Sequence, residues 1–266
     1  MTIRPAPLVV LDHPSLEYVR QHHHALDVRT VATWTALVAV LREVGPPTVA
    51  LVNPYGEDET APAPELFALL ESFPSATVVC AFGTTAERVG DIRQMLQAGI
   101  SGIVNLHVDT TPAVAARHIH EAVGRPFKRQ VEAALPHHLS ADARHIVRAA
   151  CEAVLFGGGV DEVADVFGVN SKTLSVWCRR FKLGPTRNLL VWVRLLLSAA
   201  MLEDRGRTVD RVALAVGYAS GRGLRRAFEQ TLGTAPRDIR NSGALSRVSQ
   251  AFREHLLAVA ATGSRG

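Results

Sequence analysis

Short apolar segments alternate with helix-like segments through the first half of the chain. The apolar segments are rich in Val, Ile and Leu, and they lie at Leu8–Leu11, Val49–Val52, Thr77–Ala81 and Gly102–Leu106. Strands buried on both faces of a parallel sheet show this pattern, with little polar alternation. Helical spacing of apolar residues predicts helices at Ser15–His24, Thr33–Glu43, Pro64–Ser72, Ala86–Ala98 and Pro112–Val123. The repeated β-α order predicts a doubly wound α/β domain with a five-stranded parallel sheet over residues 1–124.

The segment after this domain has the composition of a linker. Pro126 and Pro136 both disfavour a continuous helix, so we predict a linker over residues 125–140. Ser140 is a suitable N-cap for a helix that runs from Ala141 to Phe156.

A helix-turn-helix pattern follows the glycines at 157–159. Apolar residues at 160, 163, 164 and 167 form one helical face, Gly168 ends that helix, and Asn170 is a suitable N-cap for a second helix from Ser171 to about Phe181. The inward face of the second helix is Leu174, Trp177, Cys178 and Phe181. Its outward face is polar and basic, and consists of Ser171, Lys172, Thr173, Ser175, Val176, Arg179 and Arg180. A recognition helix that enters the major groove has this construction.

The same pattern recurs 49 residues later, where Gly217 takes the place of Gly168. Thr208 is expected to cap the first helix, and Ser220 is expected to cap the second, from Gly221 to Leu232. Leu224 and Phe228 would face inward. The residues expected to face DNA here are Ser220, Arg222, Arg225 and Arg226. Arginine binds guanine edges and phosphates in bidentate fashion.

A segment that is apolar almost all the way round, Thr186–Asp204, joins the two patterns and predicts a buried connecting helix. Such a helix would hold both recognition helices in one body. They could then enter successive major-groove segments, roughly 34 Å apart along B-DNA. The tail, residues 241–266, contains one short amphipathic segment near Val248–Ala260 that either packs on the domain or stays mobile.

Charge separates the two halves of the chain. Residues 1–125 carry 8 basic and 13 acidic residues, whereas the remainder carries 21 basic and 12 acidic residues. This asymmetry indicates that only the second half meets a polyanion, and we expect double-stranded DNA as the partner. The most apolar run, Leu189–Leu202, is too short for a membrane span and is interrupted by Arg194. Together with an N-terminus unlike a secretion signal, this predicts a cytoplasmic protein with no membrane partner.

The second half resembles the DNA-binding domain of AraC/XylS-type regulators over residues 142–240. The resemblance is most specific in Gly217-Tyr218-Ala219-Ser220, the inward Leu224 and Phe228, and the run from Gly233 to Arg240 that contains Pro236. Arg194-Leu195 and Ala199 to Leu202 resemble the connecting helix of that family. Two residues depart from the family pattern, because Gly221 and Gly223 weaken the start of the second recognition helix. The resemblance implies that this helix contributes mainly backbone contacts.

The first half is similar to response-regulator receiver domains, which have a flavodoxin-like fold. The similarity is carried by Leu11-Asp12-His13-Pro14, Val49–Pro54 and Gln97–Gly102. In that family a carboxylate at the end of the third strand accepts the phosphoryl group, and here the position falls on Asn53, an amide. Asp12 alone remains of the acidic pair that holds Mg²⁺. The hydroxyl position falls near Ala81, unless Thr84 or Thr85 substitutes, and the lysine position falls on Asn105 or Leu106. Asp12 and Asn53 therefore mark a degenerate phosphorylation site.

Other candidate chemistry has simpler explanations. His22-His23-His24 point in different directions on a helix and are expected to be solvated, and His118 and His120 do not share a helical face. The cysteines at 80, 151 and 178 have no metal-like spacing and are expected to be buried thiols. We expect no catalytic residues, no metal, no cofactor and no enzymatic activity.

These features together predict a sequence-specific transcription regulator. Its N-terminal pseudo-receiver would form a homodimer or sense an unknown protein partner or small molecule. Two alternatives remain open at this point. One is a phosphorylation-dependent response regulator, and the other is a protein-interaction adapter that has lost DNA binding.

Overall fold

The computed structural model describes residues 7–16, 28–55, 60–109, 111–240 and 242–262. The chain divides into two compact units. Residues 4–126 with 204–206 form the N-terminal unit, and residues 127–203 with 207–266 form most of the C-terminal unit.

The N-terminal unit is built on a parallel sheet with the strand order β2-β1-β3-β4-β5. Its strands are β1 (Leu8–Leu11), β2 (Val28–Val31), β3 (Val49–Val52), β4 (Thr77–Phe82) and β5 (Gly102–Asn105). The predicted five-stranded parallel sheet is therefore confirmed. The apolar runs at 8–11, 49–52, 77–81 and 102–106 did not include β2. This edge strand exposes Arg29 and Thr30, so its sequence lacks the continuous apolar run of a strand buried on both faces.

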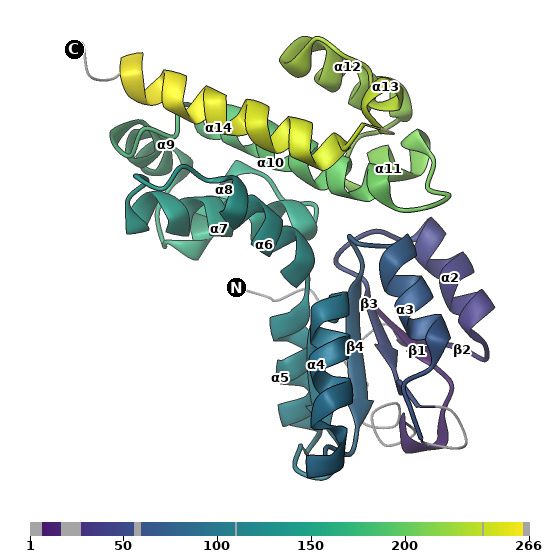
Figure 1. Ribbon diagram of the computed structural model, residues 1–266. Coiled ribbons are helices and arrows are strands. Elements are labelled where there is room, and N and C mark those ends of the chain that lie inside the picture. Colours follow the sequence, from purple (N-terminus) through teal and green to yellow (C-terminus); the bar gives the residue numbers. More distant parts are fainter. Residues whose placement is uncertain (1–6, 17–27, 56–59, 110, 241, 263–266) are drawn as a thin grey trace. The chain divides into compact units, whose positions relative to one another are not determined.

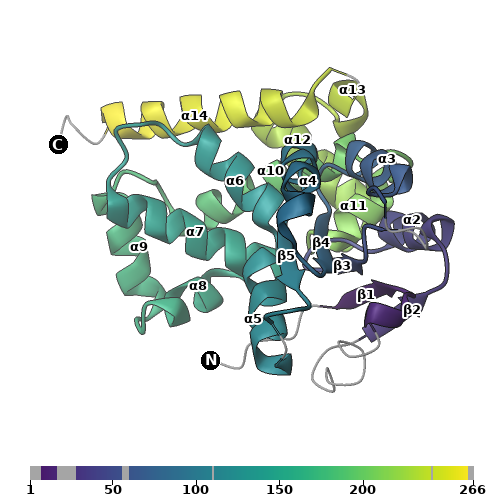
Figure 2. The same cartoon turned by 60° about the horizontal axis from the view of Figure 1, so that its bottom comes forward.

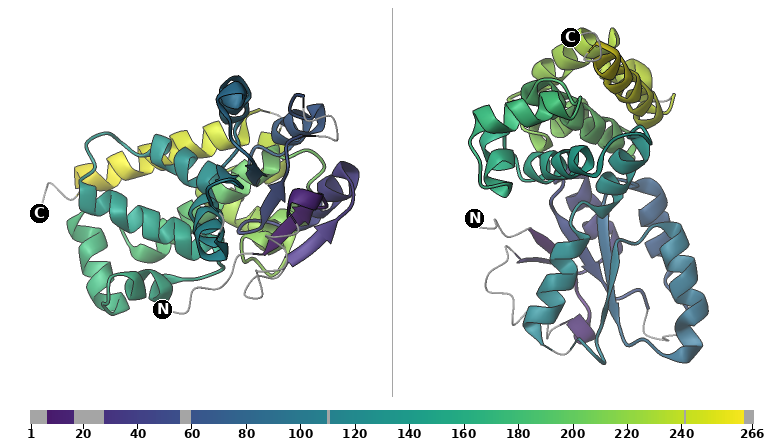
Figure 3. Two further views of the ribbon diagram at one scale, coloured as in Figure 1. Left: turned by 90° about the horizontal axis from the view of Figure 1, so that it is seen from below. Right: turned by 90° about the vertical axis from the view of Figure 1, so that its left-hand side faces the viewer.

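Helices cover both faces of this sheet, as Figures 2 and 3 show. One layer contains α2 (Trp34–Glu43), α3 (Pro64–Ser72) and α4 (Val89–Ala98), and the other contains α5 (Pro112–Ala122). Side chains along each strand point alternately to the two faces. Those of Val9, Val52 and Cys80 belong to the core beneath α2, α3 and α4. Gly99 ends α4 with φ 109°, the left-handed conformation that suits glycine.

Two predicted helices of this unit differ from the structure. The segment Ala86–Ala98 divides into a 3-10 turn, η2 (Ala86–Arg88), and α4. Of the predicted helix Ser15–His24, the structure describes only the start, which belongs to the 3-10 turn η1 (Pro14–Leu16). The rest, including the histidines at 22–24, lies outside the described residues.

The C-terminal unit is all-α in its described residues, and its helices surround the long helix α10 (Figure 1). They are α6 (Arg125–Ala134), α7 (Ala141–Leu155), α8 (Val160–Val166), α9 (Ser171–Arg180), α10 (Thr186–Glu203), α11 (Val209–Ala215), α12 (Gly221–Leu232), α13 (Pro236–Arg240) and α14 (Ala244–Thr262). The predicted connecting helix is buried on most sides, with Leu195 and Leu196 fully inaccessible. One apolar core includes residues of α7 to α14, so the helices of this unit pack as one body.

Most of the segment that we expected to be a linker, residues 125–140, instead forms α6. Pro126 is the second residue of this helix, where a missing backbone N–H breaks no intrahelical hydrogen bond. Phe127 and Val131 are buried in the core of the C-terminal unit. Glu132 accepts a hydrogen bond from Arg144 at 2.6 Å and ties α6 to α7. The local effect of proline was therefore outweighed by its position in the helix and by tertiary packing.

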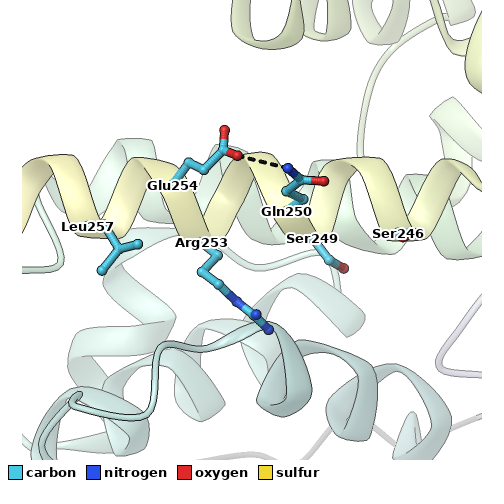
Figure 4. A pocket seen from close by; sticks show the side chains of 6 residues that line it. All are labelled: Ser246, Ser249, Gln250, Arg253, Glu254 and Leu257. Atoms are coloured by element: carbon cyan, nitrogen blue, oxygen red, sulfur yellow. Dashed lines mark hydrogen bonds between the residues drawn. The ribbon is translucent and has the colours of Figure 1, made fainter.

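The tail forms a nineteen-residue helix, α14, that lies along α10 (Figure 1). Val248, Phe252 and Leu256 are buried, and the Phe252 ring centroid lies 5.7 Å from that of Trp192 on α10. Figure 4 shows the side of α14 where Arg253 reaches the neighbouring helix; its guanidinium donates hydrogen bonds to the carbonyls of Ala133 and Ala134 at the end of α6. The tail therefore packs on the domain.

In the part of the chain that the structure describes, no helix is both long and apolar enough to cross a membrane.

Candidate nucleic-acid interface

The turn between α8 and α9 orients the first candidate recognition helix. Gly168 adopts φ 64° after the end of α8, a conformation that glycine takes without strain. The Asn170 side chain accepts a hydrogen bond from the backbone N–H of Thr173 at 2.9 Å, which confirms the predicted N-cap. Leu174 and Cys178 are fully buried, so the opposite face of α9 is turned outward.

The outward face of α9 exposes most of the residues expected to meet DNA. Lys172, Val176, Arg179 and Arg180 are exposed, and 59% of the Val176 surface is accessible. Ser171, Thr173 and Ser175 are half-buried. The Ser175 hydroxyl lies 3.3 Å from the hydroxyl of buried Thr186 at the start of α10, so this side chain is partly engaged within the domain.

The turn between α11 and α12 has a related geometry. Thr208 caps α11 by accepting a hydrogen bond from the backbone N–H of Arg211 at 3.2 Å, as predicted. Gly217 follows α11 with φ 85°, and the Tyr218 side chain packs on the core. Burial raises the pKa of Tyr218, although the positive charge of Arg194 acts in the opposite direction.

Ser220 stands at the N-cap position of α12, as predicted, but its side chain makes no capping hydrogen bond. Among the described residues, the Ser220 side chain accepts no hydrogen bond from the first turn of α12, although its backbone is extended as in an N-cap residue. Its backbone carbonyl accepts the N–H of Gly223 at 3.0 Å instead. Ser220 is exposed, so its hydroxyl lies on the surface beside the start of the helix.

The outward face of α12 is cationic, with Arg222, Arg225 and Arg226 all exposed. Leu224 and Phe228 are buried on the opposite face, as predicted. An acidic residue that sequence analysis did not single out lies beside this face. The Asp210 carboxylate is 3.9 Å from the Arg225 guanidinium, and a side chain on Gly221 would overlap it. Sequence spacing carried no sign of this contact, because it depends on how α11 packs against α12.

Helix α10 connects the two turns physically. Its Arg194 donates a hydrogen bond to the Gly158 carbonyl, 3.0 Å away, in the turn before α8. The positive charge of the same guanidinium partly opposes the burial that raises the pKa of Tyr218 in the second unit. Arg240, the closing residue of the AraC/XylS-like pattern, donates to the carbonyl of Arg207 at 2.6 Å, before α11. The two arginines therefore bind backbone carbonyls that precede α8 and α11, the first helix of each helix-turn-helix unit.

Sequence analysis also missed two exposed cations near the end of α9. Lys182 lies in the loop after the helix with φ 59°, and Arg187 is the second residue of α10. Their proximity in sequence to Arg179 and Arg180, the last two residues of α9, could have pointed to them.

The residues that we predicted to mark a degenerate phosphorylation site lie at the carboxyl edge of the sheet in the N-terminal unit. Asp12 is exposed after β1, whereas Asn53 is buried after β3. The Asn53 amide donates a hydrogen bond to Ser15 Oγ at 2.9 Å, and its oxygen accepts the backbone N–H of Tyr55 at 2.9 Å. An amide held in this way is a poor nucleophile, and it does not carry the charge of an acceptor carboxylate.

Other polar side chains at this edge of the sheet make hydrogen bonds with one another. Asn105 stands at the end of β5, and its amide donates a hydrogen bond to the Thr84 hydroxyl after β4. Of the hydroxyl groups considered for this position, that of Thr84 accepts the hydrogen bond from Asn105. The Tyr55 hydroxyl donates a hydrogen bond to Asp91 at 3.0 Å. Burial is the larger cause, and this hydrogen bond a smaller one, that raise the pKa of Tyr55 to about 12. These side chains are thus hydrogen-bonded in two pairs, Asn105 with Thr84 and Tyr55 with Asp91.

Comparison with known proteins supports the assignment of the helical region. Residues 163–242 match the family model described as a helix-turn-helix domain. No curated protein matches the chain.

Two solved structures are similar to the chain at low identity. One is the RcsB response regulator of Salmonella typhimurium, described for its conformational dynamism in DNA interaction, with 20% identity over 67% of this chain and 91% of that one and a TM-score of 0.33. The other is the xylose-binding transcription activator XylR, with 14% identity over 91% of this chain and 100% of that one and a TM-score of 0.34. TM-scores this low do not establish a common arrangement of the whole chains.

The family match spans α9 to α13 and most of α8, the segment in which both turns, both outward basic faces and the connecting helix were found. Residues 163–242 are therefore a helix-turn-helix domain of the AraC/XylS type.

Proposed function

We propose that the protein is a sequence-specific transcription regulator in which α9 reads bases and α12 mainly grips the DNA backbone. The observation that carries this proposal is the exposed basic face of α9, set behind a capped and buried helix-turn-helix core. Lys172 and Val176 lie toward the start and middle of that face, where a recognition helix contacts base edges and thymine methyl groups. Arg179 and Arg180, at its end, would contact phosphates.

The remaining polar residues of the two faces complete the proposed interface. Ser171, Thr173 and Ser175 on α9, and Ser220 beside α12, have hydroxyl groups that can donate to phosphate oxygens. Arg222, Arg225 and Arg226 supply the charge on α12, whose two early glycines offer no side chain for base contact.

The N-terminal unit is proposed to be a pseudo-receiver that forms a homodimer and carries no phosphorylation chemistry. The amide of Asn53 and the engagement of Asn105 with Thr84 support the loss of that chemistry. Val89 and Leu96 of α4 are 53% and 52% exposed, and apolar side chains exposed on one helix favour a protein contact. We place the protein in the cytoplasm, where its three free cysteines stay reduced.

Selection of genomic DNA fragments with the purified full chain tests DNA recognition. We expect enrichment of a defined sequence and binding that weakens steeply as salt rises, because phosphate contacts release counterions. Weak binding that does not respond to salt would instead identify an adapter without DNA recognition.

Two further measurements test the pseudo-receiver. Incubation with acetyl phosphate, followed by mass spectrometry, should give no acid-labile phosphoryl group; one on Asp12 or another carboxylate would identify an active receiver. Sedimentation should show a dimer that Leu96→Asp weakens, whereas an unchanged assembly would exclude α4 from the contact.

A further inference from the structure

The Asp210 carboxylate occupies an unusual place at the start of the second recognition helix. Asp210 is the second residue of α11, yet its Oδ1 atom lies 3.9 Å from the Arg225 Nη2 atom on α12. Gly221, the first residue of α12, is buried beneath the same carboxylate, since a Cβ atom there would overlap Oδ1. The carboxylate therefore packs directly against the backbone of the first turn of α12.

Both groups that Asp210 approaches would otherwise attract a DNA phosphate. The first turn of a helix has backbone N–H groups without intrahelical partners, and the positive end of the helix dipole lies there. The Ser220 side chain does not cap this turn. Arg225 adds a full positive charge one turn further along, with 48% of its side chain exposed.

We propose that Asp210 is an autoinhibitory residue that competes with DNA phosphate for Arg225 and for the first turn of α12. In free protein the carboxylate holds the arginine, and DNA must displace it to make the backbone contact. Every DNA sequence meets this cost. Asp210 thus lowers the affinity for all DNA by the same factor and leaves the discrimination between sequences unchanged. This inference rests on the proposed DNA-binding function.

The chain contains a matched control for this proposal. Asp161 is the second residue of α8, as Asp210 is of α11, and both aspartates follow a valine. When α9 and α12 are aligned on their buried leucines, Leu174 and Leu224, Ser175 stands where Arg225 stands. Asp161→Asn therefore removes the same charge from the same helical position, without releasing an arginine.

The first test compares the affinity of Asp210→Asn, Asp161→Asn and the wild-type chain for a fluorescent random-sequence duplex at several salt concentrations. We expect Asp210→Asn to bind roughly twofold to fivefold more tightly at low salt, the range typical of an exposed ion pair. The gain should shrink as salt rises, because salt screens exposed charges. Asp161→Asn should show a smaller gain. The preference for a selected operator over random DNA should stay the same in both variants, because the cost is common to every sequence.

Two further variants show whether Asp210 acts through Arg225 and through its position. In an Arg225→Gln background, Asp210→Asn should lose most of its effect. Gly221→Ala should displace the carboxylate without changing any charge, and so should also tighten binding to random DNA. Gly223→Ala is its control, because a Cβ atom there would meet the Tyr218 ring at an ordinary 3.5 Å. Thermal unfolding identifies any variant that fails to fold, in which case the remaining members of the set decide.

The outcomes separate this inference from the function on which it rests. Equal affinity of Asp210→Asn and Asp161→Asn, or a gain that persists with Arg225→Gln, overturns the inference while DNA binding stands. A wild-type chain that binds no duplex at any salt rejects the proposed function, and the inference with it.

Discussion

Arg179 and Arg180 end α9 on its exposed side, where a recognition helix leaves the major groove and meets phosphates. Replacing either one with alanine should weaken DNA binding for all sequences alike. DNA binding releases about one counterion per phosphate contact. Loss of one contact should therefore make the slope of log affinity against log salt less steep by about 1. Mobility-shift titrations over a salt series measure this slope. Arg93→Ala, which removes an exposed arginine from α4, serves as the control. An unchanged slope for both α9 variants would assign the phosphate contacts elsewhere.

The structure has room for a small side chain at Gly223. It lies in the first turn of α12, and a Cβ atom would make only an ordinary contact with Tyr218. Alanine has a higher helix propensity than glycine, so Gly223→Ala should stabilise the domain by up to about 1 kcal/mol. Urea unfolding of the two chains measures the difference. A loss of stability would mean that close packing, not tolerance of a weak helix start, explains this glycine.

How well single residues could be predicted depended on how local their interactions are. The caps Asn170, Thr208 and Ser140 could be predicted because capping is a local interaction. Each side chain accepts a hydrogen bond from a backbone N–H only three residues away in sequence. Ser220 looked equivalent in sequence but makes no such bond. Asp210 gave no signal at all, since its partners lie on another helix.

At the level of elements, α14 stabilises the helical unit through an apolar stripe. Phe252 is fully buried and lies against Trp192. Phe252→Ala should lower the free energy of unfolding by about 3–5 kcal/mol, as loss of a buried aromatic side chain does. Leu257 on the same helix is 45% exposed, so Leu257→Ala should change it by less than about 0.5 kcal/mol. Equal effects of the two substitutions in denaturant unfolding would show that α14 does not pack through Phe252.

The contact between α6 and α7 should depend on pH. Burial tends to raise the pKa of Glu132, but its hydrogen bonds and ion pairs with Arg144 and Arg148 outweigh this and lower the pKa below its usual 4.5. The ionised carboxylate therefore stabilises the fold above pH 4.5, and this contribution is lost as pH falls through the lowered pKa. Glu132→Gln should cost no more than about 1 kcal/mol at neutral pH, because the pair is partly exposed. The difference between the two chains in urea unfolding should vanish in acid; a constant difference would contradict this linkage.

Elements with strong periodicity or unbroken apolar runs were predictable, and elements defined by packing were not. Strand β3 and helix α12 have the predicted bounds because burial on one or both faces marks the sequence itself. Strand β2 lies at the sheet edge and carries polar residues. Helix α6 was hidden by Pro126, whose effect depends on its place in the helix, and only tertiary contacts such as those of Phe127 define it.

For the molecule as a whole, the fold class followed from the order of elements, whereas the interface needed the packed domain. The charge asymmetry and the two glycine turns indicated which half meets DNA and which helices expose arginine. The half-burial of Ser175 and the approach of Asp210 to Arg225 appear only when α10, α11 and α12 are packed together.

The single core that surrounds α10 also constrains the DNA sites that the protein can use. Because α9 and α12 belong to one packed body, the distance between the two base-pair segments that we propose they contact should be fixed. One base pair inserted between those segments rotates one away from the other by roughly 35°. We expect the insertion to weaken binding more than a single substitution, which typically costs about 1–3 kcal/mol; equal losses in competition binding would contradict this. Regulatory sites for such a protein can diverge in evolution by exchange of bases, but hardly by insertion or deletion.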